Sequence, residues 1–314
     1  MFNRNRVLLP VIAAVAAGAT VLSGCSSSAN KPSTSSPNTG STSTGTTTGT
    51  TTGTSTGAAP GADAAVVALI PAAVKSKGTL TVATDASYPP DESVAKDGHT
   101  IIGMDADLAK ALGTVMGLKV KLVNATFDTI IPGLQGGKYD IGLSSFTDNK
   151  DREKTVDFVT YFQAGEGFYV KAGSGKKFDG LSSLCGHTVS VESGTTEETD
   201  AKSQGKKCKV TVLSFADQSA ANLAVSSGRA DVGFADSQVA DYIVKQANGQ
   251  FESSGTAFEV APYGIALPKG NGMAPAVQAA LKALIADGTY TKIMTTWGVQ
   301  AGAITAPVIN GATS

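Results

Sequence analysis

Strand and helix signals alternate along the chain from Thr79 onward. The segment "TLTVATD" (79–85) alternates and is rich in Thr and Val, which is typical of a strand. The segment "DADLAKALGTVMG" (105–117) places Leu108 and Leu112 at helical spacing and ends at a glycine. "KVKLVNA", "FDTIIPGLQGG" and "YDIGLSS" then favour a strand, a short helix and a strand. This β-α-β-α-β order predicts an α/β fold with parallel strands and helices on both faces.

The same order returns in the second part of the chain, without a repeat of the sequence itself. Strands are predicted over 167–173, 187–196, 209–215 and 231–236, and helical stretches over 217–230 and 273–298. This pattern therefore predicts two α/β units in series. Ligands of open α/β sheets bind beyond the carboxyl ends of the strands. The polar residues at predicted strand ends are the candidates: Asp85, Ser144, Ser145, Thr195, Thr196 and Asp236.

Charge and histidine content exclude several classes of function. The 314 residues carry a formal net charge of -1, which offers no basic surface for nucleic acid. The two histidines, His99 and His187, lie far apart in sequence, which argues against a His-based metal site or a serine triad. No cofactor and no metal are predicted.

The first residues have the features of an export signal. Arg4 and Arg6 precede an apolar stretch over 7–21, which has the length of a signal peptide and is too short to span a membrane comfortably. "LSGC" (22–25) resembles the lipobox of bacterial lipoproteins, which implies cleavage after residue 24 and a lipid on Cys25. The alternative is an ordinary secretory signal with an incidental cysteine. Export to the outer face of the cell membrane, with a lipid anchor, is the prediction.

Residues 26–60 contain mostly Ser, Thr, Gly, Pro and Asn. Such a segment buries too little apolar surface to offset its ordering entropy, so we predict a disordered linker over 25–62 that begins at the lipidated cysteine. A further hypothesis is that its threonines carry sugars.

Cys185 and Cys208 remain after Cys25 is assigned to the anchor. In an exported protein such a pair favours a disulfide, which would contribute about 3 kcal/mol in the chain-entropy model. Two buried free thiols are the alternative.

Six motifs over residues 77–300 resemble the polar-amino-acid class (family 3) of extracellular solute-binding proteins of ABC importers. They are "TDASYPP", "GMDADLAKAL", "FDTIIPGLQGGKYDIGLSSFTDNKDREKTVDF", "VESGTT", "GRADVGFADSQVADYIV" and "DGTYTKIMTTWG". The resemblance implies a two-lobed, hinged periplasmic-binding-protein-like fold of type II that closes on one free amino acid. The chain would cross between lobes near 163–169 and 258–264. Lobe 1 would comprise 63–166 and 263–314, and lobe 2 would comprise 167–262.

The resemblance also assigns roles to residues that would hold the ligand's charged groups. Arg152 matches the arginine that grips the α-carboxylate, for which a planar guanidinium is suited. Asp236 matches the acid that pairs with the α-ammonium group. Ser145 and Thr147 match positions that contact both groups, and Ser144 matches the serine before them. Thr195 and Thr196 stand at a helix start, where the dipole favours an anion.

The remaining matches concern the ligand's side chain. Tyr88 and Phe127 match aromatic walls that sandwich it, and Asp85 matches the position that reaches its distal end. An acid there favours a basic amino acid, with glutamine next. Asp91 stands where the family usually has Phe, and is either a second acidic contact at the mouth or a solvated loop charge.

Each residue taken alone has a structural alternative. Arg152 in "DNKDREK" could be a surface arginine, Asp236 a helix N-cap and Tyr88 a packed loop aromatic. The two serines could be ordinary turn residues. We interpret one of Asp105 and Asp107 as ordering the pocket from behind and the other as a cap or a solvent-facing residue, and Glu166 as hinge surface.

These predictions together describe a monomeric binding protein, not an enzyme, which delivers an amino acid to the transmembrane subunits of an ABC permease. One alternative is a dehydratase-like enzyme on the same scaffold, which would need a general acid over the substrate. The other is a ligand-sensing lipoprotein for a signalling partner.

Overall fold

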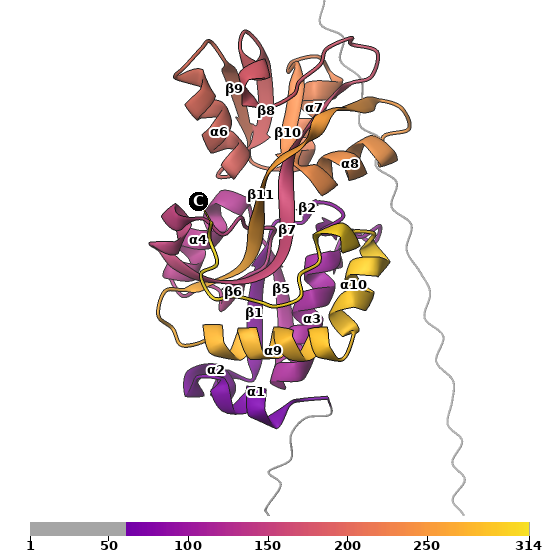
Figure 1. Cartoon of the computed structure of the whole chain (residues 1–314). Helices are drawn as coiled ribbons and strands as arrows, with labels where there is room; N and C mark the ends of the chain where they lie inside the picture. Colours follow the sequence, from indigo (N-terminus) through magenta and orange to yellow (C-terminus); the bar gives the residue numbers. More distant parts are fainter. Residues whose placement is uncertain (1–60, 314) are drawn as a thin grey trace, which may run out of the picture. The chain divides into compact units, whose positions relative to one another are not determined.

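The structure is a computed structural model that describes residues 61–313. A mixed sheet of eight strands in the order β5-β1-β6-β11-β7-β10-β8-β9 connects two sets of helices (Figure 1). The predicted α/β fold is confirmed. We call the part built on β5, β1 and β6 lobe 1, and the part built on β10, β8 and β9 lobe 2.

Lobe 1 is built on three parallel strands. β1 (Thr79–Thr84) lies between β5 (Lys119–Asn124) and β6 (Ile141–Gly142) and is parallel to both. The strands and helices predicted between residues 79 and 145 are present, although β6 is only two residues long. The other elements of this lobe are α1 (Ala64–Leu69), α2 (Ala72–Lys77), β2 (Ser87–Tyr88), β3 (Glu92–Val94), β4 (Ile101–Ile102), α3 (Met104–Met116), α4 (Phe127–Gln135), α5 (Lys150–Glu153), α9 (Ala274–Ala286), α10 (Thr289–Trp297) and η2 (Gln300–Gly302).

Lobe 2 repeats the parallel arrangement, with its first strand again in the centre. β8 pairs in parallel with both β9 and β10. Its helices begin at side-chain caps: the Thr195 hydroxyl accepts from the Glu198 N–H, and the Asp217 carboxylate accepts from the Ala220 N–H. The bounds are η1 (Leu181–Leu184), β8 (Thr188–Glu192), α6 (Thr196–Gly205), β9 (Thr211–Phe215), α7 (Gln218–Ser226), β10 (Val232–Asp236) and α8 (Ser237–Gln246).

Two long antiparallel strands, β7 (Val156–Lys171) and β11 (Phe251–Pro268), pair with each other and run from one lobe to the other (Figure 1). The prediction for 167–173 was too short, and β11 was not predicted, because most residues of its first half are exposed and lack an apolar pattern. The predicted helical stretch 273–298 is two helices, broken at Gly288, whose φ is 82°. The lobe boundaries given above stay a prediction.

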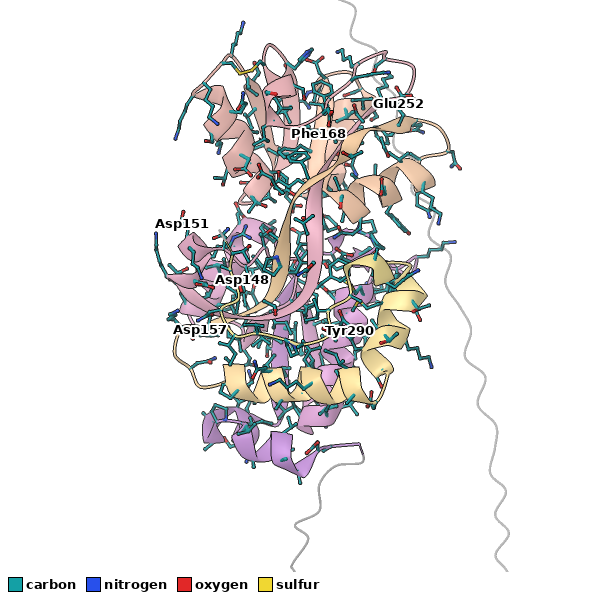
Figure 2. The ribbon with its side chains drawn as sticks, viewed as in Figure 1. Asp148, Asp151, Asp157, Phe168, Glu252 and Tyr290 are labelled. Atoms are coloured by element: carbon teal, nitrogen blue, oxygen red, sulfur yellow. A yellow bond between two sulfur atoms is a disulfide. The ribbon has the colours of Figure 1, made fainter. Side chains whose placement is uncertain are left out.

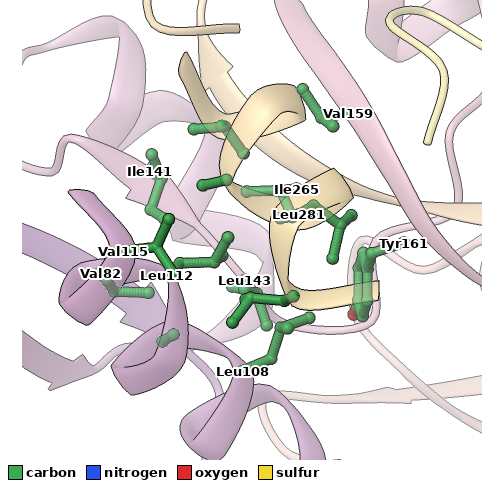
Figure 3. Packing of buried hydrophobic residues seen from close by; sticks show 14 of the residues in the cluster. Val82, Leu108, Leu112, Val115, Ile141, Leu143, Val159, Tyr161, Ile265 and Leu281 are labelled. Carbon is green, nitrogen blue, oxygen red and sulfur yellow. The ribbon is translucent and has the colours of Figure 1, made fainter. Parts of the chain in front are cut away.

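Each lobe has its own apolar core. In lobe 1, Leu108 and Leu112 of α3 pack with Val82, Ile141 and Leu281 (Figure 3). In lobe 2 a separate cluster surrounds Phe168, whose ring centroid lies 4.5 Å from that of Phe234. Figure 2 shows Phe168 among the side chains of lobe 2 and Tyr290 among those of lobe 1. The burial of each lobe is therefore largely self-contained.

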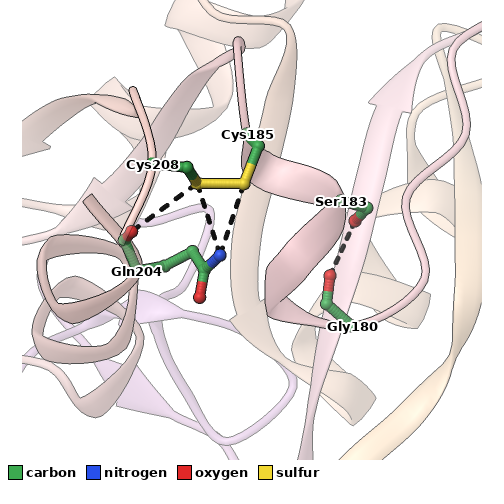
Figure 4. The surroundings of a disulfide bond; sticks show 5 residues. All are labelled: Gly180, Ser183, Cys185, Gln204 and Cys208. Carbon is green, nitrogen blue, oxygen red and sulfur yellow. Dashed lines mark hydrogen bonds between the residues drawn. A yellow bond between two sulfur atoms is a disulfide. The ribbon is translucent and has the colours of Figure 1, made fainter. Parts of the chain in front are cut away.

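A disulfide joins Cys185, after η1, to Cys208, after α6, with the two Cα atoms 5.6 Å apart (Figure 4). The predicted pairing is confirmed, and the alternative of two free thiols is wrong. The side-chain amide of Gln204 lies 3.3 Å from each sulfur. The bond links the connections at the two ends of a segment that holds β8 and α6.

The predicted signal peptide (1–24), Cys25 and all but the last two residues of the predicted linker lie outside the described residues. Within residues 61–313, no helix combines the length and the apolar character that crossing a membrane requires.

The two cores allow a test of the packing. Leu108 is fully buried in lobe 1, so Leu108→Ala should lower the free energy of unfolding by about 2–5 kcal/mol through lost burial and a residual cavity. Leu223 is 65% exposed, so Leu223→Ala should change it by about 0.5 kcal/mol or less. Urea unfolding followed by circular dichroism measures both; equal effects would contradict the assignment of this core.

Candidate ligand-binding site

A narrow cavity is lined by residues of both lobes. All ten residues that the sequence predicted as ligand contacts lie on its wall, so the structure brings the whole predicted set together. They are Asp85, Tyr88, Phe127, Ser144, Ser145, Thr147, Arg152, Thr195, Thr196 and Asp236. Their role toward a ligand stays a prediction.

The sheet topology explains why these residues meet. Asp85 follows β1 and Ser144 follows β6, and these two strands are parallel. Glu192 ends β8 and Asp236 ends β10, which are also parallel. Carboxyl ends of parallel strands share one edge, and the two lobes present these edges to the same cavity.

Arg152 lies on the cavity wall and is held in place by both lobes. Its guanidinium donates to the carbonyl oxygens of Thr147 and Gly194, each at 2.9 Å, and lies over the rings of Phe127 and Phe146. The free surface arginine suggested by "DNKDREK" is therefore wrong. Gly194 has a φ of 84°, and a Cβ there would lie 2.9 Å from Cβ of Asp128, so this close approach of the lobes requires glycine.

Asp236 supplies a buried acid on the opposite lobe. It is the N-cap residue of α8, as the structural alternative predicted, but its side chain makes no capping hydrogen bond. Its Oδ2 instead accepts a hydrogen bond of 2.9 Å from the Tyr88 hydroxyl, whose oxygen accepts from the Asp236 N–H. Burial raises the pKa of Asp236 well above its ordinary value, and the charge of Glu197 adds to the effect. Tyr88 is thus a cavity residue that also joins the lobes.

The two threonines at the start of α6 use their hydroxyl groups differently. Thr195 donates to the Glu192 carbonyl at 2.8 Å and caps α6, so its hydroxyl is already used. Thr196, the first residue of α6, lies with its Oγ1 3.3 Å from that of Thr147 across the lobes. Thr196 lines the cavity, so the N-terminus of this ten-residue helix lies at the cavity wall.

Comparison with known proteins agrees with this geometry. Residues 80–300 match the model for bacterial extracellular solute-binding proteins, family 3. The chain belongs to this family.

Relatives of this solute-binding protein include the arginine-binding protein ArgT of Corynebacterium glutamicum. The two are 34% identical over an aligned region that covers 78% of this chain and 82% of ArgT. The glutamine-binding protein GlnH of Bacillus subtilis is 32% identical over 63% of this chain and 72% of its own length. The solved structure of an ancestral arginine-binding protein bound to arginine is 38% identical, with a TM-score of 0.67, over 70% of this chain and 98% of that one.

Ser144 and Ser145 of the solute-binding protein donate hydrogen bonds to buried acids and are not ordinary turn residues. Ser144 accepts from the Asp85 N–H at 2.9 Å and donates to Glu92 at 2.8 Å. Ser145, with a φ of 51°, donates to Asp91 at 2.9 Å. Asp91 is fully buried, does not line the cavity and also accepts from Gln238. Both alternatives for Asp91, a contact at the mouth and a solvated charge, are therefore wrong.

Asp105 orders the cavity from behind, as interpreted from the sequence. Its Oδ2 accepts from the Ser145 N–H at 3.0 Å and from the Tyr161 hydroxyl at 2.8 Å. Burial, with a contribution from the charge of Asp91, raises the pKa of Asp105 to about 8. Asp107, by contrast, faces outward and accepts from the Trp297 indole.

Three cavity acids were missed: Glu92, Glu192 and Glu197. Glu192 ends a strand in the same way as Asp236, so the rule of polar strand ends could have found it. Glu197 follows Thr196 in α6, and Glu92 follows a loop, where the sequence gives no comparable signal.

Glu166 was interpreted as hinge surface, which is wrong. It is 5% exposed and lies beside Asp200 and Glu259, with carboxylate oxygens within 4.8 Å of one another. Burial and then the charge of Glu197 raise the pKa of Glu166 to about 11. The carboxyl group is therefore protonated at neutral pH, and we assign no ion to this group of acids.

Buried acids give the solute-binding protein a testable pH dependence. The pKa of Asp105 is raised in the folded state, so the stability from this group is complete below pH 3.8 and is lost as pH rises toward about 8. The melting temperature of the ligand-free protein should fall between pH 5 and 8, and Asp105→Asn should make that fall smaller. Thermal unfolding across pH measures it, with the exposed Asp241→Asn as control. An unchanged slope in Asp105→Asn would contradict the assignment.

Proposed function

We propose that the chain is an extracellular, lipid-anchored binding protein that captures one free polar amino acid and delivers it to the transmembrane subunits of an ABC importer. The ligand we favour is basic, with glutamine next. The protein acts as a monomer, needs no cofactor, and has its lobes at 63–166 with 263–314 and at 167–262.

The observation that carries this proposal is the pairing of opposite charges in one cavity. Arg152 of lobe 1 and Asp236 of lobe 2 both line it, which are the partners that an α-carboxylate and an α-ammonium group require. The aromatic rings of Tyr88 and Phe127 line the same cavity and can cover a side chain, at roughly 0.8 kcal/mol for each buried methylene.

The preference for a basic ligand is supported by the balance of charge. The cavity wall carries five acidic side chains, and Arg152 is the sole basic residue among the described residues that line it. After Arg152 and Asp236 take the zwitterionic groups, the remaining acids repel a ligand carboxylate and attract a cation. Relatives of this chain are named for arginine, glutamine and cystine, which fits a polar side chain.

The anchor and the partner are supported by sequence. "LSGC" at 22–25 resembles a lipobox, and the Ser/Thr/Gly-rich segment after it would hold the two lobes away from the membrane. Membership of family 3 supports delivery to a permease.

Arg152→Ala should remove detectable binding, because each charge-assisted hydrogen bond contributes about 1.5–3 kcal/mol and a bidentate pair has two. The loss is expected to exceed ~100-fold, by titration calorimetry, with the ligand found in a thermal-shift screen of the twenty amino acids, ornithine and citrulline. Arg229→Ala is the matched control, since Arg229 is exposed and outside the cavity. Unchanged affinity in Arg152→Ala would contradict the proposed site.

Asp85→Asn tests which group meets the ligand's distal end. We expect arginine binding to weaken roughly tenfold or more, while glutamine binding changes roughly threefold or less, because an amide does not need a charged partner. Calorimetry with both ligands measures the difference. If the affinities for arginine and glutamine fall by the same factor, Asp85 does not select the ligand's side chain.

Two other functions remain to be separated from this one. A solved ancestral amino acid-binding protein, 38% identical with a TM-score of 0.66 over 72% of this chain, is described as a precursor of cyclohexadienyl dehydratase. Recovery of the bound amino acid unchanged after prolonged incubation argues for binding rather than catalysis. Loss of amino acid uptake on deletion of the gene, with signalling intact, separates import from sensing.

A further inference from the structure

Two carboxyl groups meet across the lobes at one part of the cavity. Asp85 follows β1 in lobe 1 and Glu192 ends β8 in lobe 2, and both carboxyl groups line the cavity. Both are buried, at 4% and 2% exposed, and each affects the pKa of the other. Two buried carboxyl groups that lie near each other share a proton or enclose a cation.

The surroundings of the two groups differ. Both oxygens of Asp85 already accept backbone N–H bonds, from Ser87 at 3.1 Å and from Phe127 at 2.9 Å, and these bonds favour its ionised form. Glu192 receives no such bond, and its Oε1 is buried without any hydrogen-bond partner. The proton of the pair therefore belongs on Glu192.

Nothing basic offsets Glu192 from the elements packed around it. Burial raises its pKa well above the ordinary value, and the charge of Asp85 is the next cause. The titratable groups that face Glu192 are Asp85 after β1, Glu197 of α6, Asp217 before α7, Tyr88 of β2 and Tyr169 of β7.

The pair lines the same cavity as the groups assigned to the α-carbon, Arg152 and Asp236. Among charged groups, Asp85 has the largest effect on the pKa of Glu192. On the proposed function, a ligand held at Arg152 and Asp236 would extend its side chain toward Asp85 and Glu192.

We propose that Glu192 and Asp85 together form a two-carboxylate receptor for the cationic head of the ligand, and that binding of arginine or lysine expels the proton of Glu192 into solvent. This inference rests on the proposed function. The proton balance is simple: Glu192 changes from carboxylic acid to carboxylate, one proton goes to the buffer, and the ligand's positive charge replaces it between the two acids.

A ligand with a neutral head behaves differently at the same place. The acid form of Glu192 can donate a hydrogen bond to the carbonyl oxygen of glutamine or citrulline and keeps its proton. Citrulline has nearly the shape of arginine without the charge, so the pair of ligands separates charge recognition from fit. The ratio of arginine affinity to citrulline affinity should rise with pH, by up to about tenfold per unit below the pKa of Glu192, because the titration of Asp236 affects both ligands alike.

The experiment is calorimetry of the full chain with arginine and with citrulline, in buffers of different ionisation enthalpy at one pH. We expect arginine to release about one proton more than citrulline, because any proton that Asp236 releases to the α-ammonium group is common to both ligands. In Glu192→Gln this difference should vanish and arginine affinity should fall roughly 10- to 100-fold, with citrulline affinity changed much less. Glu252→Gln, at an exposed position of lobe 2, should behave as the unchanged protein.

Each outcome is decisive. Arginine binding that releases no more protons than citrulline binding, or equal affinity for the two ligands, overturns the receptor while leaving amino acid capture intact. Absence of binding to any amino acid overturns the proposed function and this inference with it. Should Glu192→Gln fail to fold, the proton count and pH profile of the unchanged protein still decide the matter.

Discussion

Excess negative charge in a buried cavity is the constraint on which the rest of the molecule depends. Five acids and one arginine line the wall, and Asp91 and Asp105 are buried behind it. An ionised carboxylate taken out of water costs several kcal/mol unless a partner or a proton compensates it. Arg152 compensates part of this charge, and hydroxyl and backbone donors such as Ser145 and Tyr161 solvate more. The remainder is carried by protons, and a cationic ligand can take their place.

Contacts between the lobes lie at the cavity and also behind it. At the cavity, the Tyr88 hydroxyl joins Asp236, the Arg152 guanidinium joins the Gly194 carbonyl, and Thr147 lies beside Thr196. Behind it, Gln238 donates to Asp91 and the Gln218 N–H donates to Ser87. On the proposed function, several groups that would touch a ligand also hold the lobes together, so binding and closure are coupled.

The sequence predicted the position of a residue where a local pattern determines it, and did not where contacts distant in sequence determine it. Strand ends could be predicted, because the strand-like runs of residues end at Asp85 and Asp236, and the cavity residues followed from those ends and from the family resemblance. The burial of Asp91 could not, because it depends on Ser145 and Gln238, which lie 54 and 147 residues away. Strand β11 escaped for a related reason: its first half pairs with β7 while most of its side chains remain exposed.

The acid pair also bears on what a permease would meet. With the lobes closed and no ligand bound, the proton of Glu192 compensates the pair. With a cationic head bound, the charge of the ligand takes the place of that proton. Expelling the proton costs about 1.4 kcal/mol for each pH unit below the pKa of Glu192, and the attraction between the ligand's cation and the two carboxylates has to exceed this cost. An uncharged side chain cannot supply that attraction, so the proposed pair distinguishes a closed form loaded with a positively charged ligand from one that holds a neutral ligand or none.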